Sequence, residues 1–130
     1  MIPSKKAIHN YKAITLDAAV EYASPYELTK MLFSGALKSL TLVPMLYEKK
    51  DFELASKELS RSMAIINGLR DSLDLSQGEL AENLYELYSY MIRTLGKSIK
   101  ANDSSKVIEV KDLLTQIDEA WAAIPLEFRS

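Results

Sequence analysis

The chain contains no cysteine and a single histidine among its 130 residues. Without cysteine, the protein cannot form disulfides, use a thiol nucleophile or bind metal through thiolates. Glycine and proline number only four each, so breaks in regular secondary structure are few. The 16 basic and 18 acidic residues nearly balance, and the formal charge of -2 argues against a nucleic-acid partner. These absences fit a protein of the reducing cytoplasm.

Long hydrophobic runs are also missing. No apolar stretch approaches the roughly 20 residues that a membrane-spanning helix needs. Lys5 and Lys6 are followed by residues 7–10, which do not begin an apolar run of the length found in signal peptides. We therefore expect a cytoplasmic protein with no membrane span.

The residue types that carry chemistry in helical bundles are absent from the necessary positions. His9 precedes every predicted long helix, so it cannot supply the Glu and His spacing of a di-iron bundle. Carboxylate pairs such as Asp112 and Glu119 fall on helix surfaces, where charges usually serve solubility. The chain has no glycine-rich phosphate-binding motif. We predict that the protein is not an enzyme and uses no metal or other cofactor.

What the chain does contain is helical periodicity. Ser24 is a strong helix cap, Pro25 suits the first helical position, and Glu27 completes a capping box. Apolar residues then recur at spacings of three and four, which places them on one helix face. The pattern predicts long helices over about residues 25–47, 51–73, 80–99 and 104–124.

Short polar connections place consecutive helices side by side. We therefore predict an all-α fold in which residues 25–124 form an antiparallel up-down-up-down four-helix bundle. Residues 1–24 are predicted to form an N-terminal arm and a short cap helix, and residues 125–130 a C-terminal tail. The core stripe predicted for the third long helix consists of Leu80, Leu84, Leu87, Tyr88, Met91, Leu95 and Ile99.

The helices carry more apolar residues than one stripe each requires. In the first long helix, Phe33 and Leu40 belong to a second apolar stripe, displaced from that of Leu28. Two interpretations stay open: a broad core, or a groove that receives an amphipathic helix from a partner. Under the second interpretation the predicted partner-binding residues are Tyr11, Ile14, Leu28, Phe33, Leu37, Leu40, Ile65, Tyr85 and Ile92.

The arm itself is rich in apolar residues that have no obvious place to pack. Tyr11 and Ile14 are two of them. One interpretation is that the arm covers the groove until the partner arrives, which protects the free protein from aggregation. The other is that the arm is an ordinary cap on one end of the bundle.

A set of residues distributed along the chain carries a resemblance to a known family. In chain order these are Tyr11, Ala23, Ser24, Leu28, residues 31–36, residues 65–73, Glu79, Leu80, residues 83–84, residues 87–91, Asn102, Asp103, Ala120 and Trp121. Together they resemble the pattern of the flagellar secretion chaperone FliS family over about residues 11–124. The chain departs from that pattern at Ser34, where the family usually has Asp, at Thr94 and at Pro44.

The resemblance implies a four-helix bundle that acts as a cytoplasmic export chaperone. It implies binding of the disordered C-terminal segment of flagellin, prevention of premature polymerisation, and delivery to the flagellar type III export gate. A second hypothesis is that the same scaffold binds an anti-sigma factor or another regulator of flagellin level. The free protein is expected to be a monomer or a weak homodimer. The alternative is a helical adaptor that binds another flagellar or secreted partner through the same groove.

Overall fold

The computed structural model describes residues 24–125 and residue 127 of the chain. Within these residues the structure has four long helices and no strand, so the prediction of an all-α fold is confirmed. The predicted arm and cap helix lie outside the described residues, as do Tyr11 and Ile14. The helices are α2 (Pro25–Glu48), α3 (Phe52–Asp71), α4 (Glu79–Ala101) and α5 (Ser104–Ala122), with a short 3₁₀ turn, η2 (Leu75–Gln77), before α4.

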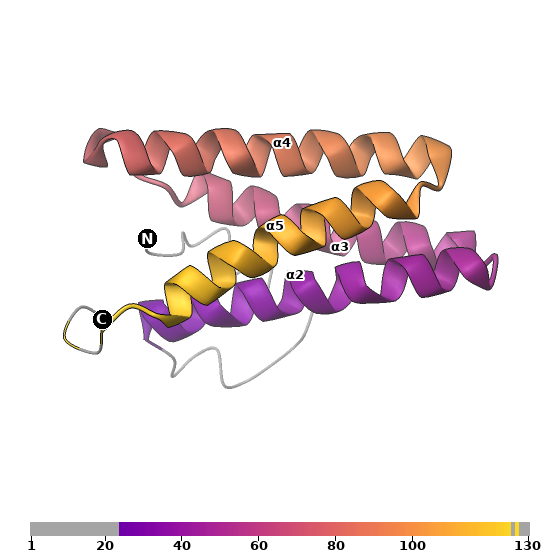
Figure 1. The fold of residues 1–130 in the computed structure, drawn as a ribbon, viewed down its shortest axis with the longest axis horizontal. Coiled ribbons are helices and arrows are strands. Elements are labelled where there is room, and N and C mark those ends of the chain that lie inside the picture. The colour runs from indigo at the N-terminus through magenta and orange to yellow at the C-terminus, as the bar shows by residue number, and fades with distance from the viewer. Residues whose placement is uncertain (1–23, 126, 128–130) are drawn as a thin grey trace.

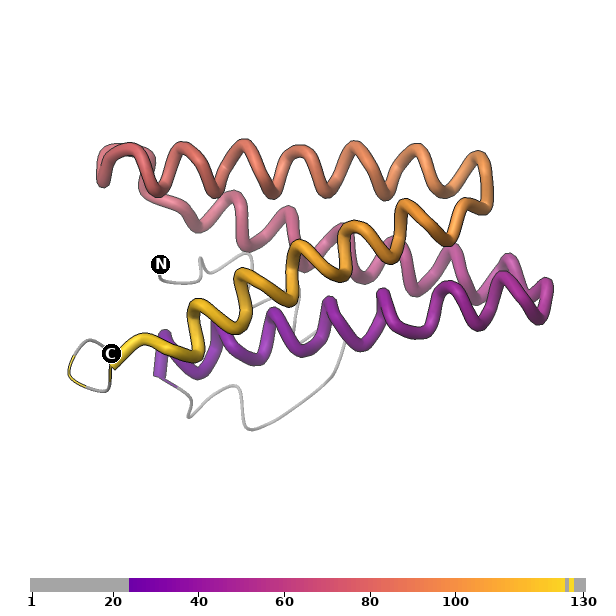
Figure 2. Tube along the Cα trace, in the orientation of Figure 1, coloured from indigo at the N-terminus to yellow at the C-terminus, as the bar shows by residue number. Residues whose placement is uncertain are grey.

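The four helices form a closed ring of neighbours. α2 contacts α3, α3 contacts α4, α4 contacts α5, and α5 returns to α2. In Figures 1 and 2, successive helices run back and forth along the long axis of the molecule. α5 packs more closely on α2 than on α4, and Figure 1 shows it crossing toward the start of α2.

Side-chain caps fix where α2, α3 and α5 begin, whereas α4 begins after Gly78 without one. The Ser24 hydroxyl accepts a hydrogen bond from the Glu27 backbone N–H at 3.2 Å, as the capping box predicts. Asp51 caps α3 and Asp103 caps α5 in the same manner, each satisfying a backbone donor that the helix leaves free. α2 continues without a break through Pro44. These local signals explain why the predicted helix starts agree closely with the structure.

The core lies along the axis of the ring and receives side chains from all four helices. Tyr88, Phe33 and Leu32 are among its largest fully buried side chains. Interdigitated apolar groups of this kind supply most of the stability of a bundle. Among the described residues, the buried cluster consists of Leu32, Phe33, Ala36, Leu40, Val43, Ala55, Leu59, Ile65, Ile66, Leu69, Tyr88, Met91, Leu95, Val107, Val110 and Leu114.

The end of α5 is fixed to the start of α2 by four side chains. The Trp121 ring stacks on Tyr26, with centroids 5.5 Å apart, and its Nε1–H donates to the Tyr26 carbonyl oxygen at 3.2 Å. One turn away along each helix, Lys30 Nζ lies 2.6 Å from Asp118 Oδ1. We call Tyr26, Lys30, Asp118 and Trp121 the α2–α5 junction. The junction fixes the second half of α5 against α2.

Candidate partner-binding surface

One face of α4 changes from exposed to buried along its length. Leu80, Leu87 and Thr94 are spaced seven residues apart and therefore lie on nearly the same face. Leu80 is 73% exposed, Leu87 is half-buried, and Thr94 is only 5% exposed. This is the reverse of what polarity alone predicts, because the leucine faces solvent and the threonine is buried. The face is covered near the end of α4 and uncovered near its start.

The position of α5 accounts for this gradient. α5 begins directly after α4, so the two helices are close at the connection. The α2–α5 junction then fixes the other end of α5 to α2, and the first half of α4 is left without that cover. We call Leu80, Leu84 and Leu87 the open face of α4.

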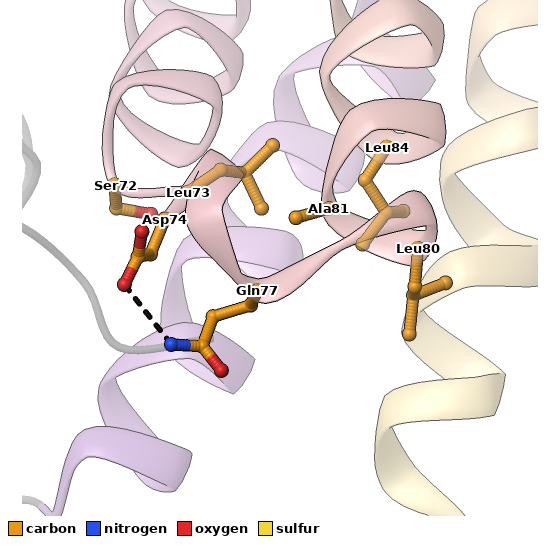
Figure 3. A pocket seen from close by; sticks show the side chains of 7 residues that line it. All are labelled: Ser72, Leu73, Asp74, Gln77, Leu80, Ala81 and Leu84. Atoms are coloured by element: carbon orange, nitrogen blue, oxygen red, sulfur yellow. Dashed lines mark hydrogen bonds between the residues drawn. The ribbon is translucent and has the colours of Figure 1, made fainter.

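A pocket of about 420 Å³ adjoins the open face, where α3 connects to α4. Its lining residues are Ser72, Leu73, Asp74, Gln77, Leu80, Ala81 and Leu84. Figure 3 shows Leu73 and Ala81 pointing toward each other across the connection, whereas Leu80 lies apart on the outer side of the first turn of α4. The pocket is therefore apolar at its centre, with Asp74 and Gln77 at its polar edge.

Hydrogen bonds hold the polar edge of the pocket in place. The Asp74 carboxylate accepts from the Ser76 backbone N–H at 3.0 Å, from the Ser76 hydroxyl at 2.6 Å and from Gln77 Nε2 at 3.2 Å. The last of these is drawn in Figure 3. The Ser76 hydroxyl bond is the largest cause of a lowered Asp74 pKa, followed by the bond from Gln77. Asp74 is therefore ionised at neutral pH and places a fixed negative charge beside the apolar pocket.

A polar cluster braces α3 against α4 near the pocket. The Arg70 guanidinium donates from Nη2 to Asn67 Oδ1 at 2.6 Å and from Nη1 to Ser89 Oγ at 3.3 Å. Its central carbon lies 5.4 Å from the centroid of the Tyr85 ring, within the range of a cation–π contact. These contacts hold the start of α4 against the end of α3.

The pocket lining combines apolar and polar side chains. The pocket offers apolar side chains and a carboxylate fixed by hydrogen bonds, but no nucleophile paired with a base. In the part of the chain that the structure describes, no three His, Cys, Asp or Glu side chains are grouped so that they could hold a metal ion. Among the same residues, no helix is long and apolar enough to cross a membrane.

The predicted partner-binding residues are divided between the core and the surface. Phe33, Leu40 and Ile65 are at most 1% exposed and belong to the core, so their side chains are not part of the exposed surface. For these three residues the alternative interpretation, a broad core, describes their position. Sequence periodicity could not separate the two interpretations, because α2 packs on both α3 and α5 and therefore buries a wide arc.

The other predicted residues that the structure describes are partly buried. Leu28, Leu37 and Ile92 pack against the edge of the core, and Tyr85 lies under Arg70. Each keeps some exposed surface. The structure does not bring these four together with the pocket, whose lining comes from a different set of residues.

Sequence reasoning missed the residues of the pocket. It placed Leu80 and Ile99 on the core stripe of the third long helix, but the structure exposes Leu80 to 73% and Ile99 to 39%. The stripe is correct for Tyr88, Met91 and Leu95, which are fully buried. One signal was present in the sequence: Leu73 and Leu75 flank Asp74 in a connection with turn chemistry, where apolar residues need a partner to cover them.

Comparison with known proteins gives a consistent result. The family model described as "Flagellar protein FliS" matches residues 7–127. The chain is 41% identical over 119 residues to the flagellar secretion chaperone FliS of Salmonella typhimurium, which covers 90% of this chain and 88% of that protein. It is 40% identical over 118 residues to the Escherichia coli protein of the same name, covering 89% and 87%. It is 34% identical over 120 residues to the flagellar secretion chaperone FliSB of Pseudomonas aeruginosa, covering 92% and 95%.

Proposed function

The chain belongs to the FliS family of flagellar secretion chaperones, and from this premise we propose that it binds the C-terminal segment of flagellin before export. The segment docks as an amphipathic helix on the open face of α4 and inserts an apolar side chain into the adjoining pocket. Binding keeps flagellin from polymerising prematurely in the cytoplasm. The complex is then delivered to the flagellar type III export gate.

The exposure of Leu80 is the observation that carries this proposal. A leucine side chain that is 73% exposed on an otherwise well-packed helix, next to an apolar pocket, is a surface that a partner can cover. Leu80, Leu84 and Leu87 recur at spacings of four and three, which matches the spacing of anchors on a partner helix.

The site presents apolar surface, which supports a chaperone that acts by covering its client. A disordered segment that folds on binding must offset the free energy of ordering itself, so it needs an extended apolar surface. The open face, the pocket and the partly exposed Leu28, Leu37 and Ile92 provide apolar surface on several helices. A client that wraps around the bundle can contact all of them.

The proposal is tested by titrating the protein with a peptide that covers the C-terminal segment of the host's flagellin. We expect saturable binding by calorimetry and a gain of peptide helicity by circular dichroism. Leu80→Asp should weaken binding by roughly 10- to 100-fold, because a buried leucine contributes about 1.5–3 kcal/mol. The variant should fold normally, since Leu80 is mostly exposed.

Ile99→Asp is the matched control. Ile99 is also an exposed apolar residue of α4, but it lies near the other end of the helix and outside the pocket. We expect this variant to bind the peptide as the wild type does. If no peptide binding or gain of helicity is seen at micromolar concentrations, the proposed client is wrong. A pull-down from the lysate of a flagellated host would then look for another flagellar or secreted partner.

A further inference from the structure

Charge is unevenly distributed between the two ends of the bundle. The pocket end comprises residues 25–36, 62–90 and 113–122, which Figure 1 places together. Among the described residues, this end has two basic ones, Lys30 and Arg70. Its eight acidic residues are Glu27, Asp71, Asp74, Glu79, Glu82, Glu86, Asp118 and Glu119. The opposite end, residues 37–61 and 91–112, has ten basic and seven acidic residues. The pocket end is therefore strongly acidic although the whole chain is almost neutral.

Both basic residues of the pocket end are engaged elsewhere. Lys30 lies 2.6 Å from Asp118 in the α2–α5 junction. Arg70 donates to Asn67 and Ser89 and lies over Tyr85. Neither pairs with a carboxylate of α4, so no basic residue described at this end offsets the negative potential of that helix.

The acidic residues of α4 run beside its open face. Glu79, Glu82 and Glu86 are spaced three and four residues apart, which aligns them on one side of the helix, and all three are exposed. None of them has an ion-pair partner among the described residues. Acidic residues interact favourably with the N-terminus of a helix, which explains why Glu79 and Glu82 occupy the first turn of α4. It does not account for Glu86, which lies beyond the first turn.

From this arrangement we infer that the open face of α4 binds a segment in which lysine or arginine residues flank the apolar anchors. The inference rests on the proposed function and defines the chemistry of the client segment at that site. The apolar side chain enters the pocket beside Leu73 and Leu84, while the basic groups lie over the row of glutamates. Complementary charge raises the association rate and fixes the direction of the bound helix.

The test compares two triple variants of the full chain on the same helix. E79Q/E82Q/E86Q removes the acidic row at the pocket end, and R93Q/K97Q/K100Q removes the same number of charges at the other end. Circular dichroism establishes that both are folded. Each is titrated with the C-terminal flagellin peptide, and with a copy of that peptide in which every lysine and arginine is replaced by glutamine, at low and high salt.

We expect the glutamate variant to bind the native peptide about tenfold more weakly at low salt, since an exposed ion pair changes affinity by a factor of roughly 1.5 to 5. Its affinity should also lose most of its salt dependence. The basic-end variant should stay within about twofold of the wild type. The uncharged peptide should bind the wild type and the glutamate variant equally.

The alternative outcomes separate this inference from the proposed function. If the native peptide binds the wild type but the glutamate variant matches it in affinity and salt dependence, the inference is wrong and the function stands. If the glutamate variant binds the peptide more tightly, the acidic row holds a competing basic segment of the same chain. The inference that the client segment is basic is then wrong. If the peptide does not bind the wild type at any salt concentration, the proposed function and the inference both fail.

Discussion

Replacing Trp121 with alanine tests whether the α2–α5 junction holds α5 in place. The substitution removes the stacking on Tyr26 and an edge contact with Phe33, whose ring centroid lies 6.5 Å away. It also removes the hydrogen bond from Trp121 Nε1 to the Tyr26 carbonyl. All three interactions join α5 to α2, so their loss should release the end of α5.

The expected loss of unfolding free energy follows from these contacts. The hydrogen bond contributes about 1 kcal/mol and the aromatic contacts about another 1 kcal/mol. Burial of most of the ring adds about 2 kcal/mol. We therefore expect Trp121→Ala to lower the free energy of unfolding by about 4 kcal/mol and Tm by roughly 15 °C. The value falls within the range for tryptophans buried in protein cores, since most of the Trp121 side chain is buried.

The assay is urea unfolding followed by far-UV circular dichroism, because the substitution removes the only tryptophan of the chain. Trp121→Phe is the control, since phenylalanine keeps a ring against Tyr26 but cannot donate the hydrogen bond. It should lose about 1 kcal/mol. A loss below 0.5 kcal/mol for Trp121→Ala, on the order of an ordinary surface change, would refute the assignment of the junction as the anchor of α5.

Two further predictions concern the core and a helix cap. Leu114→Ala should lower the free energy of unfolding, measured with urea, by about 2–5 kcal/mol because Leu114 is fully buried. Leu80→Ala should change it by less than about 0.5 kcal/mol because Leu80 is exposed. Equal losses for the two variants would contradict the assignment of Leu80 to the surface. Asp103 has a lowered pKa, chiefly because the Ser105 hydroxyl donates to it. The ionised Asp103 carboxylate therefore stabilises the folded protein fully at pH values above the pKa of about 3.9 that Asp has in an unfolded chain. This stabilisation is lost as the pH falls through the lower pKa of Asp103 in the folded protein. Asp103→Asn should make Tm less sensitive to pH below about 4. If the dependence of Tm on pH is the same in the variant and the wild type, the Asp103 cap does not contribute to the loss of stability in acid.

The helices and much of the core could be predicted because the signals that define them are local. Ser24 and Asp51 cap the helices that follow them, and both satisfy donors within three residues. The stripe of Tyr88, Met91 and Leu95 follows from a spacing of three and four residues on a single helix. Such patterns require no knowledge of what lies across the bundle.

The candidate site could not be predicted in the same way. Leu80 and Leu95 both belong to the apolar stripe predicted for this helix, yet one is exposed and the other is buried. The difference arises because α5 covers only part of α4, and no pattern within α4 records where α5 lies. Phe33 and Leu40 show the opposite difference: they were predicted to face a partner, but they are buried. The reason is that α2 has two neighbouring helices and buries a wider arc than one stripe.

The sequence by itself determined the all-α class, the helix starts, the family resemblance and the absence of cysteine chemistry, because each depends on composition or on residues close together in the chain. The tertiary structure decided which apolar residues remain open. Trp121 donates to the Tyr26 carbonyl across 95 positions of the chain, and Lys30 meets Asp118 across 88. Contacts of that separation depend on how whole helices pack, so only the folded chain shows that α5 leaves the first half of α4 uncovered beside a pocket and a row of glutamates.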